Sequence, residues 1–264
     1  HSLIKVCIFC HFADILQEYL PLCSPRLLEK GTDGYWYNGK WNLLRCRLNE
    51  YLPTLSTYKC LRHKTFFIVG DSTARQYYAF LIKLVQDINV QLPDAIREWE
   101  KIHKSINIQF HFHTFPRNTR TPLQMSDIKY TADLIDSIVG GPDVVIILSL
   151  WAHYSAVPSE TFLSRVYGIR HAIERLHSRS PDTKVVWRTG NTRKHMTVAH
   201  VIENGNWVAY QNLLGARQIL QGLDIFFMDV WDMSVCEDVY KLHPGPNVIK
   251  NHIDLILNYV CQEP

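Results

Sequence analysis

The feature that most constrains the fold is an alternation, from Phe66 onward, of short apolar segments with longer amphipathic ones. The short segments are rich in β-branched and aromatic residues and predict five strands, at Phe66–Gly70, Ile106–His113, Val144–Leu150, Val185–Thr189 and Ile225–Val230. The longer segments predict helices at Thr73–Asn89, Ser126–Val139, Ser159–Ser178, Trp207–Gln221 and Val248–Val260. In the third helix an apolar stripe recurs at three- and four-residue steps, at Phe162, Val166, Ile169, Ile173 and Leu176. This alternation predicts an α/β fold with a doubly wound, mainly parallel five-stranded sheet between helices, in a flavodoxin-like layout.

Composition limits the classes of protein to which the chain can belong. Its 264 residues are 47% hydrophobic and 20% charged, which excludes disorder, collagen and coiled coil. The net charge is only +3 without a run of basic residues, so we expect no nucleic-acid partner. The longest apolar stretch, Val144 to Ala152, is far short of the roughly 20 residues that cross a bilayer, so we expect no transmembrane segment in this chain.

Residues 1–65 differ from the rest, because they are rich in aromatics, Cys, Pro and Gly without clear periodicity. We expect them to form an irregular N-terminal cap on a domain spanning residues 66–264, in one compact unit. The chain begins at His1 instead of Met, which indicates a processed product or a fragment.

The cysteines lie at the two ends of the sequence, as terminal disulfides on a core would, and favour the secretory pathway: the Golgi lumen or secretion. Against this, their number is odd, and no Asn-x-Ser/Thr sequon supports glycosylation. A Cys236–Cys261 bridge would pin the loop between them, and Cys23, Cys46 and Cys60 could supply another bridge within the cap. The connectivity itself does not follow from the sequence.

Two residues predict nucleophilic chemistry at one edge of the sheet. The first strand ends in Gly70-Asp71-Ser72 and leads into a helix, whose N-terminal N–H groups favour a developing oxyanion. The alternative for Asp71 or Ser72 is a simple helix cap. His243 follows the last strand and precedes the last helix. Ligands of such folds bind beyond the carboxyl ends of the strands, so we expect this imidazole to reach Ser72 and accept its proton.

The sequence resembles the PC-esterase domain of the NXPE (neurexophilin and PC-esterase) proteins, a branch of the SGNH/GDSL hydrolase superfamily. The resembling segments are Gly70–Gln76, Gly140–Val145, Leu150–Tyr154, Ser178–Thr183, Met228–Trp231 and His243-Pro244 through Lys250-Asn251. They cover residues 60–261, with looser similarity in Gly34-Tyr35-Trp36 and Lys40-Trp41. The resemblance implies a secretory-pathway esterase or acyltransferase that acts on glycans through an acyl-serine intermediate. It also implies that this chain follows a neurexophilin-like domain in a longer protein.

The resemblance implies a catalytic role for Ser72 as nucleophile and for His243 as general base, with Asp71 structural and Arg75 positioning the nucleophile loop. Superfamily members usually place an Asp two or three residues before the histidine, where this chain has Lys241 and Tyr240. Asp238 is the predicted replacement, with Asp229 and Asp232 as neighbours. The alternatives are a Ser-His dyad or a domain that has lost activity.

The oxyanion hole departs from the superfamily pattern as well. Its second donor is usually a Gly after the second strand, and His113-Thr114-Phe115-Pro116 contains none. Its third donor is usually an Asn after the third strand, where this chain has Leu150 to His153. His153 and Asn191 are the predicted substitutes.

Two rim loops are locally basic, and several Trp residues fall near strand ends. Arginine binds carboxylates bidentately, so we hypothesise that Arg117, Arg120 and Arg193, beside Asn118, Arg188 and Lys194, recognise an acidic sugar such as sialic acid. Ordinary surface charge is the alternative. Trp151, Trp187 and Trp231 are candidates for stacking on a sugar, although core packing is the commoner use of Trp.

His111 and His113 face one side of a strand, but no third ligand accompanies them, so we expect no metal. We likewise expect no bound cofactor, and an acetyl donor such as acetyl-CoA as a co-substrate. The predicted function is O-acetylation of a glycan or glycoprotein. The alternatives are a glycan O-acetyl esterase and a catalytically silent carbohydrate-binding or interaction domain, which the missing Asp and Gly motivate.

Overall fold

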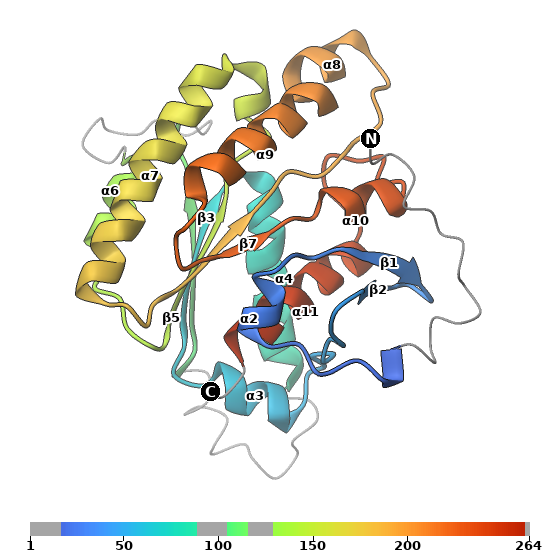
Figure 1. Ribbon diagram of the computed structural model, residues 1–264, viewed down its shortest axis with the longest axis vertical. Helices are drawn as coiled ribbons and strands as arrows, with labels where there is room; N and C mark the ends of the chain where they lie inside the picture. The colour runs from blue at the N-terminus through green and yellow to red at the C-terminus, as the bar shows by residue number, and fades with distance from the viewer. Residues whose placement is uncertain (1–16, 89–104, 116–128, 262–264) are drawn as a thin grey trace.

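The computed structural model describes residues 17–88, 105–115 and 129–261 (Figure 1). Its centre is a parallel sheet of β3 (Thr65–Gly70), β4 (Asn107–Phe112), β5 (Val144–Ser149), β6 (Lys184–Arg188) and β7 (Phe226–Met228). The strand order is β4-β3-β5-β6-β7, and every neighbouring pair is parallel. The five predicted strands and the doubly wound layout are therefore confirmed. The carboxyl ends of all five strands share one edge of the sheet, which we call the rim.

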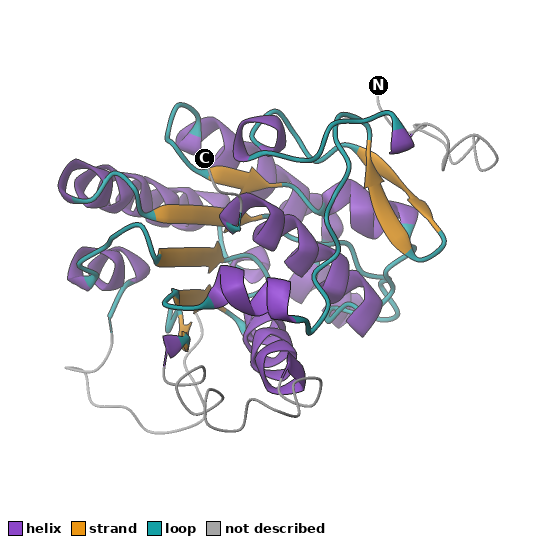
Figure 2. Ribbon diagram, turned by 90° about the horizontal axis from the view of Figure 1, so that it is seen from below, coloured by secondary structure: helices purple, strands orange, loops and turns teal. Residues whose placement is uncertain are grey.

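Helices cover both faces of the sheet (Figure 2). One face packs against α4 (Ser72–Ile88) and α11 (Pro246–Val260). The other packs against α6 (Thr131–Ser137), α7 (Ser159–Arg179) and α9 (Asn206–Leu220). The predicted stripe of α7 is buried as expected. The first five residues of the predicted helix Ser126–Val139 are not helical where they are described, and residues 126–128 lie outside the described part.

The rim carries short elements that periodicity does not predict. They are η3 (Tyr154–Ala156) after β5, α8 (Val198–Asn204) after β6, and α10 (Trp231–Cys236) after β7. Each has seven residues or fewer, too short for a helical stripe to stand out in the sequence. Within the described residues, no helix is long and apolar enough to cross a membrane.

The N-terminal cap contains limited regular structure: α2 (Pro25–Leu28), α3 (Leu55–Leu61) and a hairpin of β1 (Gly34–Tyr37) and β2 (Lys40–Leu43). Asn38 and Gly39 form the hairpin turn with φ of 49° and 70°. A two-residue turn with positive φ at both positions matches the right-handed twist of paired strands and favours Asn-Gly.

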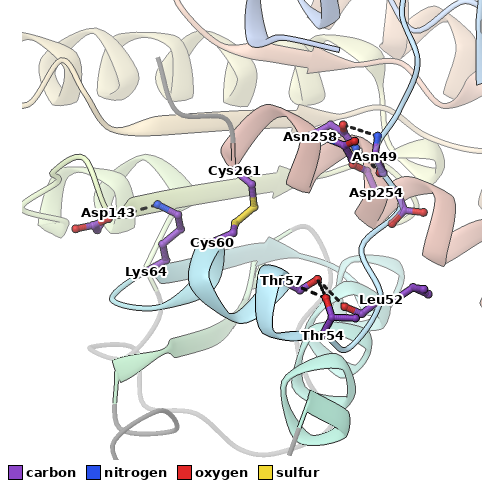
Figure 3. Close-up of a disulfide and its surroundings, with 10 residues drawn as sticks. All are labelled: Asn49, Leu52, Thr54, Thr57, Cys60, Lys64, Asp143, Asp254, Asn258 and Cys261. Carbon is purple, nitrogen blue, oxygen red and sulfur yellow. Dashed lines mark hydrogen bonds and ion pairs between the residues drawn. A yellow bond between two sulfur atoms is a disulfide. The ribbon is translucent and has the colours of Figure 1, made fainter. Parts of the chain in front are cut away.

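A polar stripe on α11 fixes the cap to the domain. Asn251 Oδ1 accepts from the backbone N–H of Trp41 at 2.8 Å, and Asn247 and Asn251 both donate to the carbonyl oxygen of Gly39. Further along, Asp254 accepts from the backbone of Tyr51 and Asn258 bonds both backbone groups of Asn49 (Figure 3). Four side chains at helical spacing thus satisfy cap backbone groups that have no sheet partner.

Four of the described cysteines form two disulfides, Cys23–Cys46 within the cap and Cys60–Cys261 between α3 and α11 (Figure 3). The predicted Cys236–Cys261 pairing is wrong. The reason is the length of α11: its 15 residues carry the chain about 22 Å away from the rim. Cys261 therefore ends near α3, at the opposite edge of the sheet from the loop that follows α10. Disulfides are typical of secreted and lumenal proteins.

Candidate active site

The nucleophile position is fixed by a sharp change from strand to helix. β3 ends at Gly70 and α4 begins at Ser72. A side chain at position 70 would collide with the carbonyl oxygen of Ser149 and the methyl group of Ala74, so only glycine fits there. The partly exposed Ser72 stands at the rim, and the first N–H groups of α4 have no partner within the helix.

His243 lies beside Ser72, as predicted. Its Nε2 is 2.8 Å from Ser72 Oγ, a hydrogen-bonding distance, although 171 residues separate them. The loop that carries His243 links α10 to α11, and the Gln76 side chain donates a hydrogen bond to the carbonyl oxygen of Pro244 at 2.9 Å. Gln76 is one helical turn after Ser72 and on the same face of α4, a spacing that identifies it in retrospect.

Burial favours the neutral form of the His243 imidazole. It lowers the pKa of His243, the carboxylate of Asp71 opposes this effect, and the positive charges of Arg75 and Arg193 add smaller decreases. A neutral imidazole accepts a proton from a serine hydroxyl, so the lowered pKa suits a general base at neutral pH.

The part of the chain that the structure describes contains no carboxylate hydrogen-bonded to His243, whose side-chain partner there is Ser72. Asp238 is exposed, with φ of 50°, and makes no hydrogen bond to His243, so its predicted place as third member is not supported. The loop rearrangement that this role requires is absent. Asp229 instead binds Arg217 and Thr189. The observed arrangement is a Ser-His dyad.

Asp71, directly before Ser72, is held by hydrogen bonds inside the protein. It is fully buried, and its Oδ1 accepts from the backbone N–H and the hydroxyl of Thr73 at 2.8 and 2.7 Å. Its Oδ2 accepts from the backbone N–H of Ala152 at 3.0 Å. The Trp151 indole in turn donates to Thr73 Oγ1 at 3.0 Å. The loops after β3 and β5 are thereby tied to each other.

Two histidines flank the nucleophile loop from the neighbouring strands. His113 follows β4 and His153 follows β5, and His113 Nε2 lies 2.9 Å from His153 Nδ1. His113 Nδ1 lies 2.5 Å from the carbonyl oxygen of Phe115. Both ring nitrogens of His113 therefore contact protein atoms. Burial lowers the pKa of His113, and the carboxylate of Asp71 has a smaller, opposite effect on it.

The loop expected to hold the second oxyanion donor keeps a glycine-like backbone without a glycine. Thr114 has φ of 64°, in the left-handed region that β-branched residues rarely adopt. Such a conformation costs about 1–3 kcal/mol and persists only where the surroundings enforce it. The loop thus has the backbone shape that a glycine would adopt, at the cost of local strain.

Asn191 and Arg188 are buried, and Asn191 contacts the loop that carries His243. The Asn191 amide donates to the carbonyl oxygens of Thr192 and Leu242, at 3.0 and 3.4 Å, and Leu242 precedes His243. Arg188 donates to Asn191 Oδ1 at 2.7 Å and is only 1% exposed, so its predicted place on a basic rim is wrong. Alternation along β6 turns Arg188 to the same face as buried Val186. Asn191 therefore braces the His243 loop, while the donor role predicted for it stays untested.

The residues predicted to bind substrate, considered together with Arg75, separate into four groups. Arg75 is exposed, and Arg193, whose guanidinium donates to Asn204 Oδ1, is partly exposed; both act electrostatically on His243. Trp151 and Trp187 are 3% and 2% exposed, so they pack in the interior and offer no face to a sugar. Trp231 is partly exposed against Tyr210, with ring centroids 5.2 Å apart. Arg117 and Arg120 lie outside the described residues.

The described residues contain no group of three His, Cys, Asp or Glu side chains placed to hold a metal ion. His111 Nε2 contacts the amide oxygen of Gln109, on the same strand, at 3.2 Å.

Comparison with known protein families identifies the family to which this domain belongs. A family model described as "NXPE family member 4-like, C-terminal domain" matches residues 41–261, which include every strand of the sheet, both dyad residues and the Cys60–Cys261 bridge. The five-stranded parallel sheet with helices on both faces is consistent with the SGNH superfamily. The chain belongs to the NXPE family, of which it carries the C-terminal domain.

Proposed function

We propose that this domain transfers an acetyl group to a hydroxyl of a glycan through an acyl-serine intermediate on Ser72. The observation that carries the proposal is the 2.8 Å contact between Ser72 Oγ and His243 Nε2 at the start of a 17-residue helix. A serine, a neutral imidazole and backbone N–H groups at a helix N-terminus are the parts that acyl transfer requires.

In the first half-reaction His243 takes the Ser72 proton as Oγ attacks the acetyl carbonyl of the donor. Charge develops on the carbonyl oxygen, which the N–H groups at the start of α4 stabilise, and His243 then gives the proton to the leaving group. In the second half-reaction the sugar hydroxyl attacks the acyl-serine. His243 takes the hydroxyl proton and returns it to Ser72 Oγ as the ester bond to the enzyme breaks. Attack by water instead would make the domain an esterase.

The charges around His243 support an acidic acceptor. Arg75 and Arg193 both reach the imidazole electrostatically, and guanidinium groups bind carboxylates through paired hydrogen bonds. We propose a sialic acid as the acceptor and acetyl-CoA or a similar thioester as the donor. The two disulfides support a lumenal or secreted site of action, and we propose the Golgi lumen, with a neurexophilin-like domain preceding this one.

Labelling with a serine-reactive fluorophosphonate tests the proposal. The parent protein is expected to label, and Ser72→Ala and His243→Ala are each expected to reduce the labelling rate by roughly 10³-fold or more. Ser178→Ala is the matched control, because this serine lies on α7 and bonds the carbonyl oxygen of Glu174. A parent that does not label, or labelling that survives Ser72→Ala, contradicts the proposal.

A catalytically silent carbohydrate-binding domain is the second candidate. Two observations favour it. Among the described residues no carboxylate is hydrogen-bonded to His243, and Thr114 has a strained backbone in the loop after β4. This candidate predicts a parent that fails to label yet binds immobilised sialylated glycans, with Arg193→Gln weakening the binding.

A further inference from the structure

Arg188 carries a positive charge into the interior of the domain. Its side chain is 1% exposed, and none of the ion pairs within the described residues includes it. Charged side chains are rarely buried without a partner of opposite charge, because removing a charge from water is costly. The contacts that the guanidinium does make therefore bear on what this residue does.

Two aromatic rings hold the guanidinium against the part of the fold that carries Ser72. The Cζ atom of Arg188 lies 5.6 Å from the centroid of the Tyr77 ring and 5.9 Å from that of Trp151. A cation over an aromatic face is attracted by the negative charge of that face. Tyr77 lies on α4, which begins at Ser72, and the Trp151 indole donates to Thr73 Oγ1 at 3.0 Å. The position of Arg188 is therefore fixed relative to the proposed nucleophile.

The hydrogen bond of Arg188 leads to the loop that carries His243. Nη2 of Arg188 lies 2.7 Å from Asn191, which is also buried. A guanidinium only donates, so the atom of Asn191 that it contacts is the amide oxygen, and the NH2 group is left to donate elsewhere. That group lies 3.4 Å from the carbonyl oxygen of Leu242, the residue before His243. Arg188 thus fixes the orientation in which Asn191 reaches this loop.

The loop after β6 contacts both sides of the site. Gly190 packs so closely on Trp151 that a Cβ atom at this position would lie 3.0 Å from the indole ring. Further along, the backbone N–H of Lys194 donates to the carbonyl oxygen of Tyr240 at 3.1 Å, three residues before His243. The loop after β6 therefore joins the surroundings of the proposed nucleophile to the loop of the proposed base.

We infer that Arg188 is a positioning residue, which holds the imidazole of His243 at hydrogen-bonding distance from Ser72 by fixing the orientation of Asn191. The inference rests on the proposed chemistry of this serine and histidine. The hydrogen bond of Arg188 goes to Asn191, so its effect on the dyad passes through that amide. Misplacing a catalytic group by 1 Å costs up to about 100-fold in rate, so such a contact is expected to affect labelling of the serine.

The test compares Arg188→Met with the parent. Methionine is also long and unbranched, but it offers no donor to Asn191. Fluorophosphonate labelling of Ser72 should slow by roughly 10-fold, because the imidazole is less well placed. Val186→Ala is the matched control, since Val186 is buried on the same face of the same strand. It should lower stability in urea and label at the parent rate.

A double-mutant cycle separates positioning from support of the fold. If Arg188 acts through Asn191, Arg188→Met should slow labelling roughly 10-fold in the parent but less than about 2-fold in Asn191→Ala. Arg188→Lys keeps the charge and a donor, and should label at a rate between those of the parent and Arg188→Met. Where Arg188→Met does not fold, Arg188→Lys takes its place in the cycle. Equal slowing in both backgrounds, or no slowing in the parent, overturns the inference.

Crystal structures of the parent and Arg188→Met make the test independent of the proposed function. In the variant the distance from Ser72 Oγ to His243 Nε2 should lengthen from 2.8 Å to beyond about 3.5 Å, outside hydrogen-bonding range. The bonds of Asp71 to Thr73 should remain. An unchanged distance overturns the inference whether or not the protein labels. A parent that does not label contradicts the proposed function, and this distance then decides the role of Arg188.

Discussion

The two halves of the dyad are supported in different ways. Ser72 directly follows Asp71, which is fully buried and accepts three hydrogen bonds. The strand before them ends at Gly70, a position where only glycine fits. His243 sits on an exposed loop that Gln76 and Asn191 hold through backbone carbonyls, the second at 3.4 Å. The proposed nucleophile is therefore positioned by the core of the fold. The proposed base is positioned by two hydrogen bonds to its loop, and burial and nearby charges set its pKa.

The largest expected effect comes from breaking the better-supported half. Asp71→Ala removes a buried acceptor and leaves the N–H groups of Thr73 and Ala152 without their partner. Each buried donor left unpaired costs about 1–3 kcal/mol, so we expect a loss of roughly 2–5 kcal/mol in the free energy of unfolding. Urea denaturation measures it. A loss below about 1 kcal/mol would show that the loop does not depend on Asp71.

Asn191→Ala is the equivalent change at the loop that carries His243. It removes the bond to the Leu242 carbonyl and leaves the buried Arg188 without its acceptor. We expect a loss of about 1–3 kcal/mol in stability and a roughly 10-fold slower labelling of Ser72, because the imidazole is less well placed. Asn42→Ala, in which an exposed amide that bonds Lys40 is lost, is the control. Labelling at the parent rate would mean that Asn191 supports the fold alone.

A smaller effect is expected at Gln76. Its amide nitrogen makes the other contact to the His243 loop, and Gln76→Ala loses this single bond to a neutral carbonyl together with an amide oxygen that is buried without a partner among the described residues. We expect stability to change by about 0.5–1.5 kcal/mol and labelling to slow by only a few-fold. If Gln76→Ala slows labelling more than Asn191→Ala does, the Gln76 contact, instead of the Asn191 brace, holds the base.

The same contrast explains what the sequence could predict. The apolar patterns of the buried strands predict strands without a competing interpretation. Ser72 and His243 can be predicted as site residues because each adjoins such an element. The hairpin carried a local signal, Asn38-Gly39, that a search for long-range periodicity passes over. Cys261 pairs with Cys60 instead of Cys236 because the length of α11 carries it away from the rim. Trp151 and Arg188 could not be assigned, because a residue at a strand end faces either the rim or the core, and only packing decides which.

The smallest expected effect is on the acidity of the base. Reaction requires neutral His243, so the labelling rate should rise with pH through the pKa of His243 and then level off. Arg75 lowers this pKa, so Arg75→Gln should raise it and shift the rising limb to higher pH, which slows labelling on the acid side and leaves the plateau unchanged. The shift should shrink as salt is added, because Arg75 is exposed and its charge is screened. Arg175→Gln, on α7, is the control and should not move the curve. A limb that stays in place in Arg75→Gln would mean that the exposed charge of Arg75 contributes nothing to the basicity of His243, which burial, Asp71 and Arg193 would then set.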